Sequence, residues 1–297
     1  MAVELRWDGD SLRMIIDSHQ HFWKYDPVRD GWITEEMSRL KRDFLPEDFE
    51  HECKANGIDG SIAVQADQSE NETLFLLDLA ERSERIVGVV GWVDLRSPAA
   101  EERLQFFSHH KKLRGFRHIA QGEPDDQFLM GRDFTRGISL LRDFGFAYDI
   151  LIYPKQLPAA IELVSRFPEQ PFVVDHLAKP PIKAGGREPW ASYMRTIAQN
   201  KNVFCKLSGM VTEADWVHWK AEDLRPYLDV VFEAFGPERV MFGSDWPVCL
   251  LGASYRRVKE VIKSYTMAHA SQHKEDIFGG NAIRFYGLRA ATHGLAA

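Results

Sequence analysis

Two histidines separated by one residue form the first chemically distinctive motif of this 297-residue sequence. His19 and His21 lie in the motif DSHQH, at the end of the apolar run 14–17. Side chains alternate along a strand, so both imidazoles should point the same way. Two imidazoles side by side can ligate one metal ion or stabilise one anionic oxygen. The H-x-H motif therefore predicts a metal site or an oxyanion site after the first strand.

Two later motifs offer groups suited to the same chemistry. Asp175-His176 closes an apolar run, and the motif GSDWP at 243–247 presents Asp245. The glycine and serine of that motif allow a sharp turn, and its proline stops the strand. A lone histidine at a strand end is usually only hydrogen-bonded, and a lone aspartate is often a helix cap or a turn residue. The three motifs together instead indicate an active site of His19, His21, His176 and Asp245.

Other polar residues near strand ends are candidates for substrate binding. Gln65, Arg117 and Tyr153 are placed to bind ring hydroxyls or a carbonyl. His118 alternates with Arg117, so only one of the two should point inward. Lys179, in the loop after Asp175-His176, is explained equally well as a solvated charge. Three tryptophans that flank the motifs could wall a sugar pocket, although packing is their commoner role: Trp23, Trp32 and Trp246.

The elements that must position these residues are eight short apolar runs. They lie at 14–17, 60–66, 86–95, 115–119, 146–152, 172–176, 203–209 and 239–245. Their Val, Ile and Phe content is typical of strands buried on both faces of a parallel sheet. Eight such strands alternating with helices in about 275 residues predict a single-domain (β/α)8 TIM barrel. Active sites of such barrels lie at the C-terminal ends of the strands, where the motifs fall.

Amphipathic segments between the runs predict the helices. They lie at 45–57, 72–85, 131–145, 157–167, 189–200 and 224–236, with a weaker segment at 97–114. Gly57, Gly145 and Gly236 stand where a helix needs a C-terminal stop. A final helix is expected at 281–288, with Asn281 as its N-cap. The barrel should span 14–288, between an N-terminal tail (1–13) and a C-terminal tail (289–297).

Composition excludes several classes of protein. The net charge of −7 leaves no electrostatic footprint for nucleic acid. The longest apolar runs are too short to span a bilayer, and residues 1–13 lack the apolar stretch of a secretory signal. Three cysteines without a C-x-x-C pair fit a reducing compartment. We therefore expect a cytoplasmic protein, a monomer or a homodimer, with a small-molecule ligand and no nucleic-acid or membrane partner.

The motifs also carry a family resemblance. DSHQHFW and GSDWP resemble the amidohydrolase superfamily, and DHLAKP, CKLSGMVTEADW, MFGSDWPVC and NAIRFYGL are similar to its L-fuconolactonase-like sugar-lactonase branch, in amidohydrolase-related family 2. The resemblance runs from Met14 to Leu288. It implies a hydrolase that opens an aldonolactone, of the L-fuconolactone or L-rhamnonolactone type, during carbohydrate catabolism. Asp245 would serve as general base and acid, and the three histidines, with a metal or Arg117, would stabilise the oxyanion.

The metal set departs from that of binuclear superfamily members. The resemblance implies that those place a bridging Lys or Glu mid-barrel and a histidine on each of two successive strands. Here only His176 matches, because Asp149 and Tyr153 occupy the strand before it and Lys206 and Ser208 the strand after it. A second ion therefore lacks ligands. We expect at most one divalent ion, with zinc the first candidate, and lactonases of this kind do not always need one. The ligands would come from His19, His21, His176 and Asp245.

Two alternatives stay open at this point. The first is a related metal-dependent amidohydrolase that acts on another lactone or decarboxylates an unsaturated carboxylic acid. A di- or tricarboxylate would need several inward cations, and the strand ends offer only Arg117 and Lys206, which favours a neutral sugar. The second is a non-catalytic sugar- or metal-binding barrel, which would keep the pocket but would not need Asp245.

Overall fold

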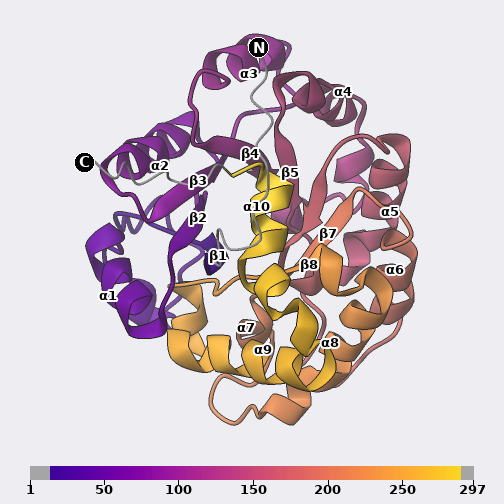
Figure 1. The fold of residues 1–297 in the computed structure, drawn as a ribbon. Helices are drawn as coiled ribbons and strands as arrows, with labels where there is room; N and C mark the ends of the chain where they lie inside the picture. Colours follow the sequence, from indigo (N-terminus) through magenta and orange to yellow (C-terminus); the bar gives the residue numbers. More distant parts are fainter. Residues whose placement is uncertain (1–13, 289–297) are drawn as a thin grey trace, which may run out of the picture.

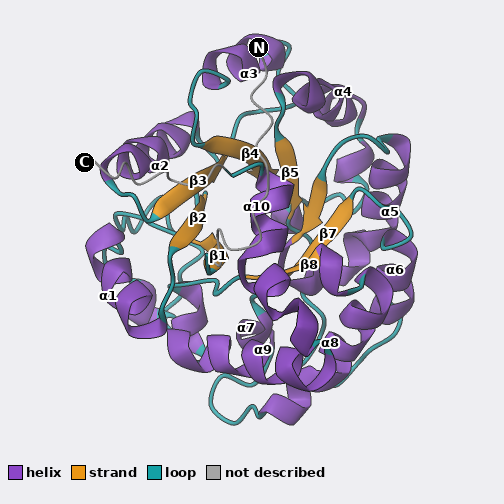
Figure 2. Ribbon diagram, viewed as in Figure 1, coloured by secondary structure: helices purple, strands orange, loops and turns teal. Residues whose placement is uncertain are grey.

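Eight parallel strands form one barrel-shaped sheet in chain order, surrounded by helices (Figures 1 and 2). A computed structural model gives the structure of residues 14–288, and the two expected tails, 1–13 and 289–297, lie outside the described residues. The strands are β1 Ile16–Gln20, β2 Gly60–Val64, β3 Ile86–Gly91, β4 Leu113–His118, β5 Ala147–Ile150, β6 Phe172–Val174, β7 Val203–Leu207 and β8 Val240–Phe242. The predicted (β/α)8 barrel is confirmed. Each strand overlaps the apolar run that predicted it.

Most helices lie in the connections between successive strands on the outside of the barrel, whereas the last two follow β8 (Figure 2). They are α1 Pro46–Asn56, α2 Glu70–Arg82, α3 Ala100–Phe107, α4 Arg132–Leu141, α5 Leu157–Arg166, α6 Trp190–Ile197, α7 Met210–Glu213, α8 Ala221–Phe235, α9 Tyr255–His269 and α10 Asn281–Tyr286. The weak segment at 97–114 forms α3. The sequence prediction missed α9, although Ser254 caps it by accepting from Arg257 N and Val258, Val261 and Ile262 form its buried stripe.

The barrel closes where the first and last strands approach each other. Gln20 and Trp246 form an isolated parallel bridge. His21 N donates to Trp246 O at 2.7 Å, and Asp245 N donates to His19 O at 2.8 Å. The hydrogen bonds that close the sheet therefore also place the H-x-H motif against the GSDWP motif.

Helix α10 lies across the barrel centre in the view of Figure 1 and packs on the apolar interior. Its Ala282 and Tyr286 belong to the cluster of Ile16, Ile62, Val64, Val90, Ala147, Val173 and Met241. The expected capping role of Asn281 is wrong, because Asn281 is the first helical residue after Gly280. Its amide instead donates to the carbonyls of Val240, at 2.6 Å, and Pro237, at 2.8 Å. Asn281 thus anchors the start of β8.

Replacing Asn281 with alanine should lower the free energy of unfolding by about 2–4 kcal/mol, because two buried carbonyls lose their donor. Chemical denaturation measures the change. Gln105→Ala, on the exposed face of α3, is the control and should stay within about 0.5 kcal/mol. Equal stability of Asn281→Ala and the control would show that the anchor contributes nothing.

The described residues give two further facts. Within 14–288, no helix is long and apolar enough to cross a membrane. Cys53, Cys205 and Cys249 are all buried and unpaired. Burial raises the pKa of Cys53 to about 12, so this thiol stays protonated.

Candidate active site

The structure brings His19, His21, His176 and Asp245 together at the C-terminal ends of β1, β6 and β8. Asp245 Oδ1 lies 3.3 Å from His21 Nε2 and 3.9 Å from both His19 Nε2 and His176 Nε2. The Nε2 atoms of His19 and His21 are 3.1 Å apart. All four side chains are nearly buried, with His21, His176 and Asp245 each exposed by only 3–5%. One small group placed among them would contact several of these atoms at once.

Unusual backbone conformations hold two of these residues. The segment His176, Leu177, Ala178 and Lys179 has φ values of 50–55°, and Asp245 has φ 58°. Left-handed conformations are costly for residues other than glycine, and runs of them are rare. Such strain concentrates at functional sites, where the surrounding structure enforces it.

Two glycines make room for the histidine rings. A Cβ on Gly209 would lie 2.6 Å from the ring of His176, and a Cβ on Gly243 would lie 2.8 Å from Cβ of His19. Gly209 also has φ +66°, a conformation that favours glycine. The loops after β7 and β8 can therefore approach the histidine rings only with glycine at these positions.

Asp17 braces the junction between β1 and the loop after β8. Its carboxylate accepts from Ser244 N at 2.8 Å, His19 N at 3.1 Å and Tyr255 OH at 2.9 Å. Burial raises the pKa of Asp17 to about 6, although these hydrogen bonds act against the shift. Asp17 is therefore a supporting residue that holds His19 and Asp245 in register.

Fixed partners orient the histidines. His21 Nδ1 lies 2.7 Å from the carbonyl of Val64, which can only accept, so Nδ1 carries a hydrogen and Nε2 faces Asp245. His176 Nδ1 lies 2.8 Å from Ser208 Oγ. Burial lowers the pKa of His176 to about 4, against the pull of Asp245 and Asp175, so His176 is neutral at pH 7.

Asp245 is a carboxylate suited to accept a proton. Burial raises its pKa, but the neighbouring His176 and His21 outweigh burial, and the net pKa lies below the ordinary value. Asp245 is thus ionised at neutral pH. An ionised carboxylate among three imidazole nitrogens can accept a proton from a bound water molecule.

Arg117 points into the barrel, and its neighbour His118 points away. Arg117 Nη1 lies 3.0 Å from Asp175 Oδ2 and 3.4 Å from His19 Nε2, and its Nη2 donates to Gln65 Oε1 at 3.0 Å. His118 stacks on Phe128 instead. Gln65 is fully buried, so the structure places its amide on Arg117 rather than at the surface of the site.

Sequence reasoning missed a buried charge cluster behind His19. Lys206 Nζ lies 2.5 Å from Asp149 Oδ2, 3.0 Å from Asp175 Oδ1 and 3.1 Å from His19 Nδ1. All four side chains are fully buried. The hydroxyl group of Tyr286, on α10, donates to Asp149 Oδ2 at 2.9 Å. Asp149 and Lys206 lie on strands and Asp175 directly follows one, so the barrel prediction already places them near the barrel interior. Only the structure shows that their side chains are in contact.

The aromatic candidates take different positions. Trp32 and Tyr153 are 42% and 39% exposed, and the ammonium of Lys179 lies 5.4 Å from the ring centroid of Tyr153. Trp23 and Trp246 are each only 2% exposed. Trp246 packs in a cluster of aromatic rings with Phe22, Phe44 and Phe49. Packing is thus the observed role of Trp23 and Trp246, and Trp32 and Tyr153 are the aromatic candidates that remain exposed.

The donor set fits one divalent ion. His19, His21 and Asp245 offer ligand atoms within 3.1–3.9 Å of one another, a spacing compatible with metal–ligand bonds of about 2.1 Å. His19, Asp175 and His176 form a second such group. The two groups share His19, and Asp175 is already paired with Arg117 and Lys206. The cluster is therefore compatible with one metal site rather than two.

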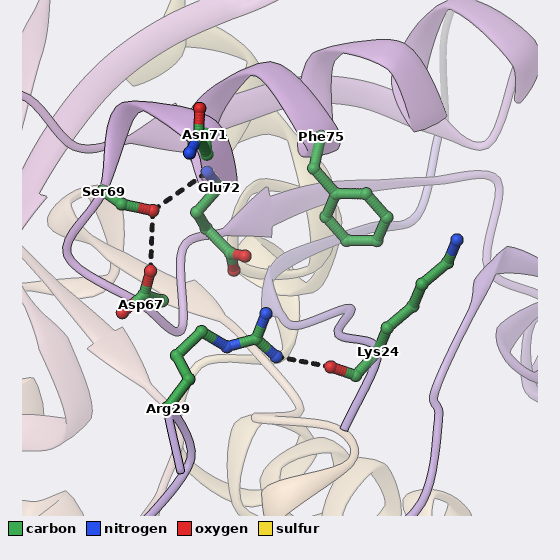
Figure 3. A pocket seen from close by; sticks show the side chains of 7 residues that line it. All are labelled: Lys24, Arg29, Asp67, Ser69, Asn71, Glu72 and Phe75. Atoms are coloured by element: carbon green, nitrogen blue, oxygen red, sulfur yellow. Dashed lines mark hydrogen bonds between the residues drawn. The ribbon is translucent and has the colours of Figure 1, made fainter. Parts of the chain in front are cut away.

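A polar pocket of about 450 Å³ lies between the loop after β1 and the start of α2 (Figure 3). Its lining residues are Lys24, Arg29, Asp67, Ser69, Asn71, Glu72 and Phe75. Glu72 accepts from Ala66 N at 3.1 Å, and burial raises its pKa to about 7. Because Ala66 follows Gln65, this carboxyl group helps to fix the residue that holds Arg117.

A family model and two curated relatives match most of this chain. A family model described as amidohydrolase matches residues 16–288. The chain is 42% identical over 284 residues to an L-fucono-1,5-lactonase of Burkholderia multivorans, covering 92% of this chain and 96% of that protein. It is 36% identical to an L-fucono-1,5-lactonase of Burkholderia ambifaria, covering 91% and 94%.

A solved structure agrees with these sequence relatives. A crystal structure of an amidohydrolase from Burkholderia multivorans with bound zinc superposes with a TM-score of 0.89 at 41% identity. The match covers 93% of this chain and all of that chain. The likeness therefore extends over the whole barrel, including every strand that carries a candidate site residue.

Proposed function

Because the chain belongs to the amidohydrolase family, we propose that its site hydrolyses a sugar lactone, L-fucono-1,5-lactone first, to the open aldonic acid. The observation that carries this proposal is an ionised Asp245 held within 3.9 Å of three imidazole nitrogens beside an inward guanidinium. The other inward cation, Lys206, is paired with Asp149 and Asp175, which fits a neutral, polyhydroxylated substrate. The site would work in the cytoplasm, in the breakdown of a deoxy sugar.

Asp245 acts as the general base. It takes a proton from a water molecule, and the resulting hydroxide attacks the carbonyl carbon of the lactone. The bond between that carbon and the ring oxygen then breaks. Asp245 returns its proton to the departing ring oxygen, which becomes a hydroxyl group of the aldonic acid.

Arg117 and His19 stabilise the negative charge that develops on the carbonyl oxygen. Their Nη1 and Nε2 atoms are 3.4 Å apart, so one oxygen atom could contact both. Arg117 Nε also has no partner within residues 14–288, so the guanidinium keeps a spare donor. Donors fixed before the reaction stabilise such an oxyanion without reorganisation. His21 and His176 complete the wall of this position.

Trp32 and Tyr153 would contact the sugar ring, because they expose their side chains at the open end of the barrel. Lys179, paired with Glu213 at 3.6 Å, would lie beside Tyr153. Gln65 and Trp246 would act indirectly, since Gln65 holds Arg117 and Trp246 supports the loop of Asp245.

A zinc ion would be held by His19, His21 and Asp245, with His176 nearby, and when bound it supplies a Lewis acid that polarises the lactone carbonyl. Support for zinc comes from the zinc-bound relative and the donor types.

A screen of aldonolactones with a pH indicator tests the proposed function, because ring opening releases acid. We expect L-fuconolactone, and more slowly L-rhamnonolactone, to be hydrolysed well above the spontaneous rate. The Asp245→Asn protein is the background control. Acid release no faster than with this variant, for every sugar lactone, would refute the proposal.

Metal content is a second prediction. Elemental analysis of purified protein should find at most one tightly bound divalent ion per chain. The reason is that Asp149 and Lys206 pair with each other and Asp175 with Arg117, which removes the ligands of a second ion. Two tightly bound equivalents per chain would contradict this interpretation of β5 and β7.

A further inference from the structure

One nearly buried carboxyl oxygen in the pocket of Figure 3 lacks a partner. Glu72 is only 5% exposed, and its Oε1 accepts from Ala66 N at 3.1 Å. Within residues 14–288, Glu72 Oε2 has no hydrogen-bond donor. Figure 3 shows the carboxyl group pointing into the pocket. Since burying an unsatisfied acceptor costs free energy, Oε2 indicates a position where a water molecule or a ligand donates.

Arg29, on the facing wall, is held in place by one edge of its guanidinium group. Its Nε and Nη2 donate to the two carboxylate oxygens of Asp30, at 2.9 and 2.8 Å. Asp30 is buried and also accepts from Asp26 N at 2.8 Å, so the pair has a fixed position. In the described part of the chain, Arg29 Nη1 has no partner. It therefore offers two hydrogens to a group in the pocket.

The side chains of Arg29 and Glu72 face each other across the pocket (Figure 3). Burial raises the pKa of Glu72 to about 7, and the charge of Arg29 acts against that shift. Asp30 is nonetheless the only ion-pair partner of Arg29 among residues 14–288. The gap between Arg29 and Glu72 therefore leaves room for a group that accepts from the guanidinium and donates to the carboxylate. A hydroxyl group does both.

The remaining walls add fixed polar groups and apolar surface. Asp67 Oδ2 accepts from Ser69 Oγ at 2.6 Å, and Ser69 Oγ accepts from Glu72 N at 3.1 Å. The ring of Phe75 forms an apolar side (Figure 3). Apolar walls with a few fixed polar groups are typical of small-molecule sites. The pocket volume of about 450 Å³ also lies within their usual range of about 300–1,000 Å³.

The charges around the pocket favour a neutral ligand. Two positive and two negative side chains line it: Lys24 and Arg29, and Asp67 and Glu72. An anion would be repelled by the carboxylates, and a cation by the ammonium and guanidinium groups. A neutral ligand with several hydroxyl groups meets no such repulsion, and it can donate to the acceptors and accept from the donors. A ring with hydroxyl groups and a C–H face is a ligand of this kind.

We propose that this pocket is an accessory binding site for a neutral, polyhydroxylated ring of the monosaccharide class. One ring hydroxyl would accept from Arg29 Nη1 and donate to Glu72 Oε2, and the C–H face would pack on Phe75. The pocket is separate from the catalytic group, because none of the candidate catalytic residues lines it. It lies in the segments that follow β1 and β2, at the same end of the barrel. Binding there does not depend on lactone hydrolysis.

Isothermal titration calorimetry with L-fucose tests the site, because this sugar has the ring and the hydroxyl groups but no lactone bond. We expect Arg29→Lys to weaken binding by about 10-fold, since lysine keeps the charge beside Asp30 but loses the Nη1 donors. Arg82→Lys is the matched control, on an exposed arginine that pairs with Asp78 in α2, and should bind L-fucose like the wild type. Equal affinities of Arg29→Lys and Arg82→Lys would overturn the proposal.

Phe75→Ala tests the apolar wall. Loss of the ring should weaken L-fucose binding by about 5–10-fold, because less apolar surface is buried. Leu74→Ala is the matched control, since Leu74 is the exposed neighbour of Phe75 and does not line the pocket. Tetrahydropyran, the same ring without hydroxyl groups, should not bind the wild type measurably. Binding of L-fucose to Phe75→Ala as tight as to Leu74→Ala, or of tetrahydropyran as tight as of L-fucose, would contradict the assignment.

Asp245→Asn distinguishes this pocket from the catalytic group. L-Fucose should bind this variant as tightly as it binds the wild type. Loss of binding in Asp245→Asn, together with wild-type binding in Arg29→Lys, would place the sugar in the catalytic group and refute an accessory site. No measurable binding to the wild type would refute it as well. Failure of the wild type on all lactones would refute the proposed function alone, because none of these titrations uses a lactone.

Discussion

Asp245→Asn should lower kcat on the lactone substrate by about 10²–10⁴-fold, the usual contribution of a general base. The amide has nearly the same size as the carboxylate but cannot take a proton from water. The substitution should add no backbone strain. Asp245 has φ 58°, and asparagine and aspartate both adopt this left-handed region more readily than most residues. We therefore expect the thermal midpoint to change little.

The control for Asp245→Asn is the same substitution at Asp94, which follows β3. Asp94 pairs with Arg96 at 3.0 Å, and its side chain is 39% exposed to solvent. Asp94→Asn should retain kcat within a few-fold. If Asp245→Asn also retains kcat within a few-fold, the proton goes elsewhere and a histidine becomes the candidate base.

Arg117→Lys should lower kcat by about 10²–10³-fold, the loss expected when one oxyanion donor is removed. Lysine keeps the positive charge beside Asp175 but cannot contact Asp175, Gln65 and the substrate oxygen together. Arg117→Met would also leave Asp175 with one partner fewer in a buried site, so its kinetics would be mixed with lost stability.

Steady-state kinetics of Arg117→Lys should place the loss in kcat more than in KM, because the contact strengthens as charge develops on the oxygen. Arg96→Lys is the matched control and should behave like the wild type. Arg96 is exposed and lies in the connection between β3 and α3. Wild-type kinetics in Arg117→Lys would limit Arg117 to its structural pairing with Asp175.

The barrel was predictable because its strands are buried on both faces and therefore appear as short apolar runs. The family resemblance carried by DSHQHFW and GSDWP is also confirmed. Helix α9 was missed although its cap and apolar stripe are present in the sequence. The amide of Asn281 was assigned to a helix cap because residue type gives its hydrogen-bonding capacity and not its partner.

Other features of the site could not be predicted from one sequence. His176, Leu177, Ala178 and Lys179 adopt left-handed conformations without a glycine among them, so local preferences predict the opposite. The cluster of Lys206, Asp149 and Asp175 depends on the barrel's curvature, which brings three separate strands to one point. Local chemistry identified the candidate site residues, but only the fold shows which charged groups surround them.

The pH dependence of kcat/KM in metal-free protein tests most directly whether an ionised Asp245 is the base. The pKa of Asp245 lies below its ordinary value, so protonation should reduce the rate only below about pH 4, and kcat/KM should be level from pH 5 to 7. Burial raises the pKa values of Asp149 and Asp17 to about 6 and that of Glu72 to about 7, so Asp149→Asn, Asp17→Asn and Glu72→Gln are measured in parallel to identify any loss caused by these carboxyl groups. A level profile in these variants is the predicted result. A loss of rate centred near pH 6.5 that persists in all three variants would assign the proton transfer to a histidine and contradict the mechanism.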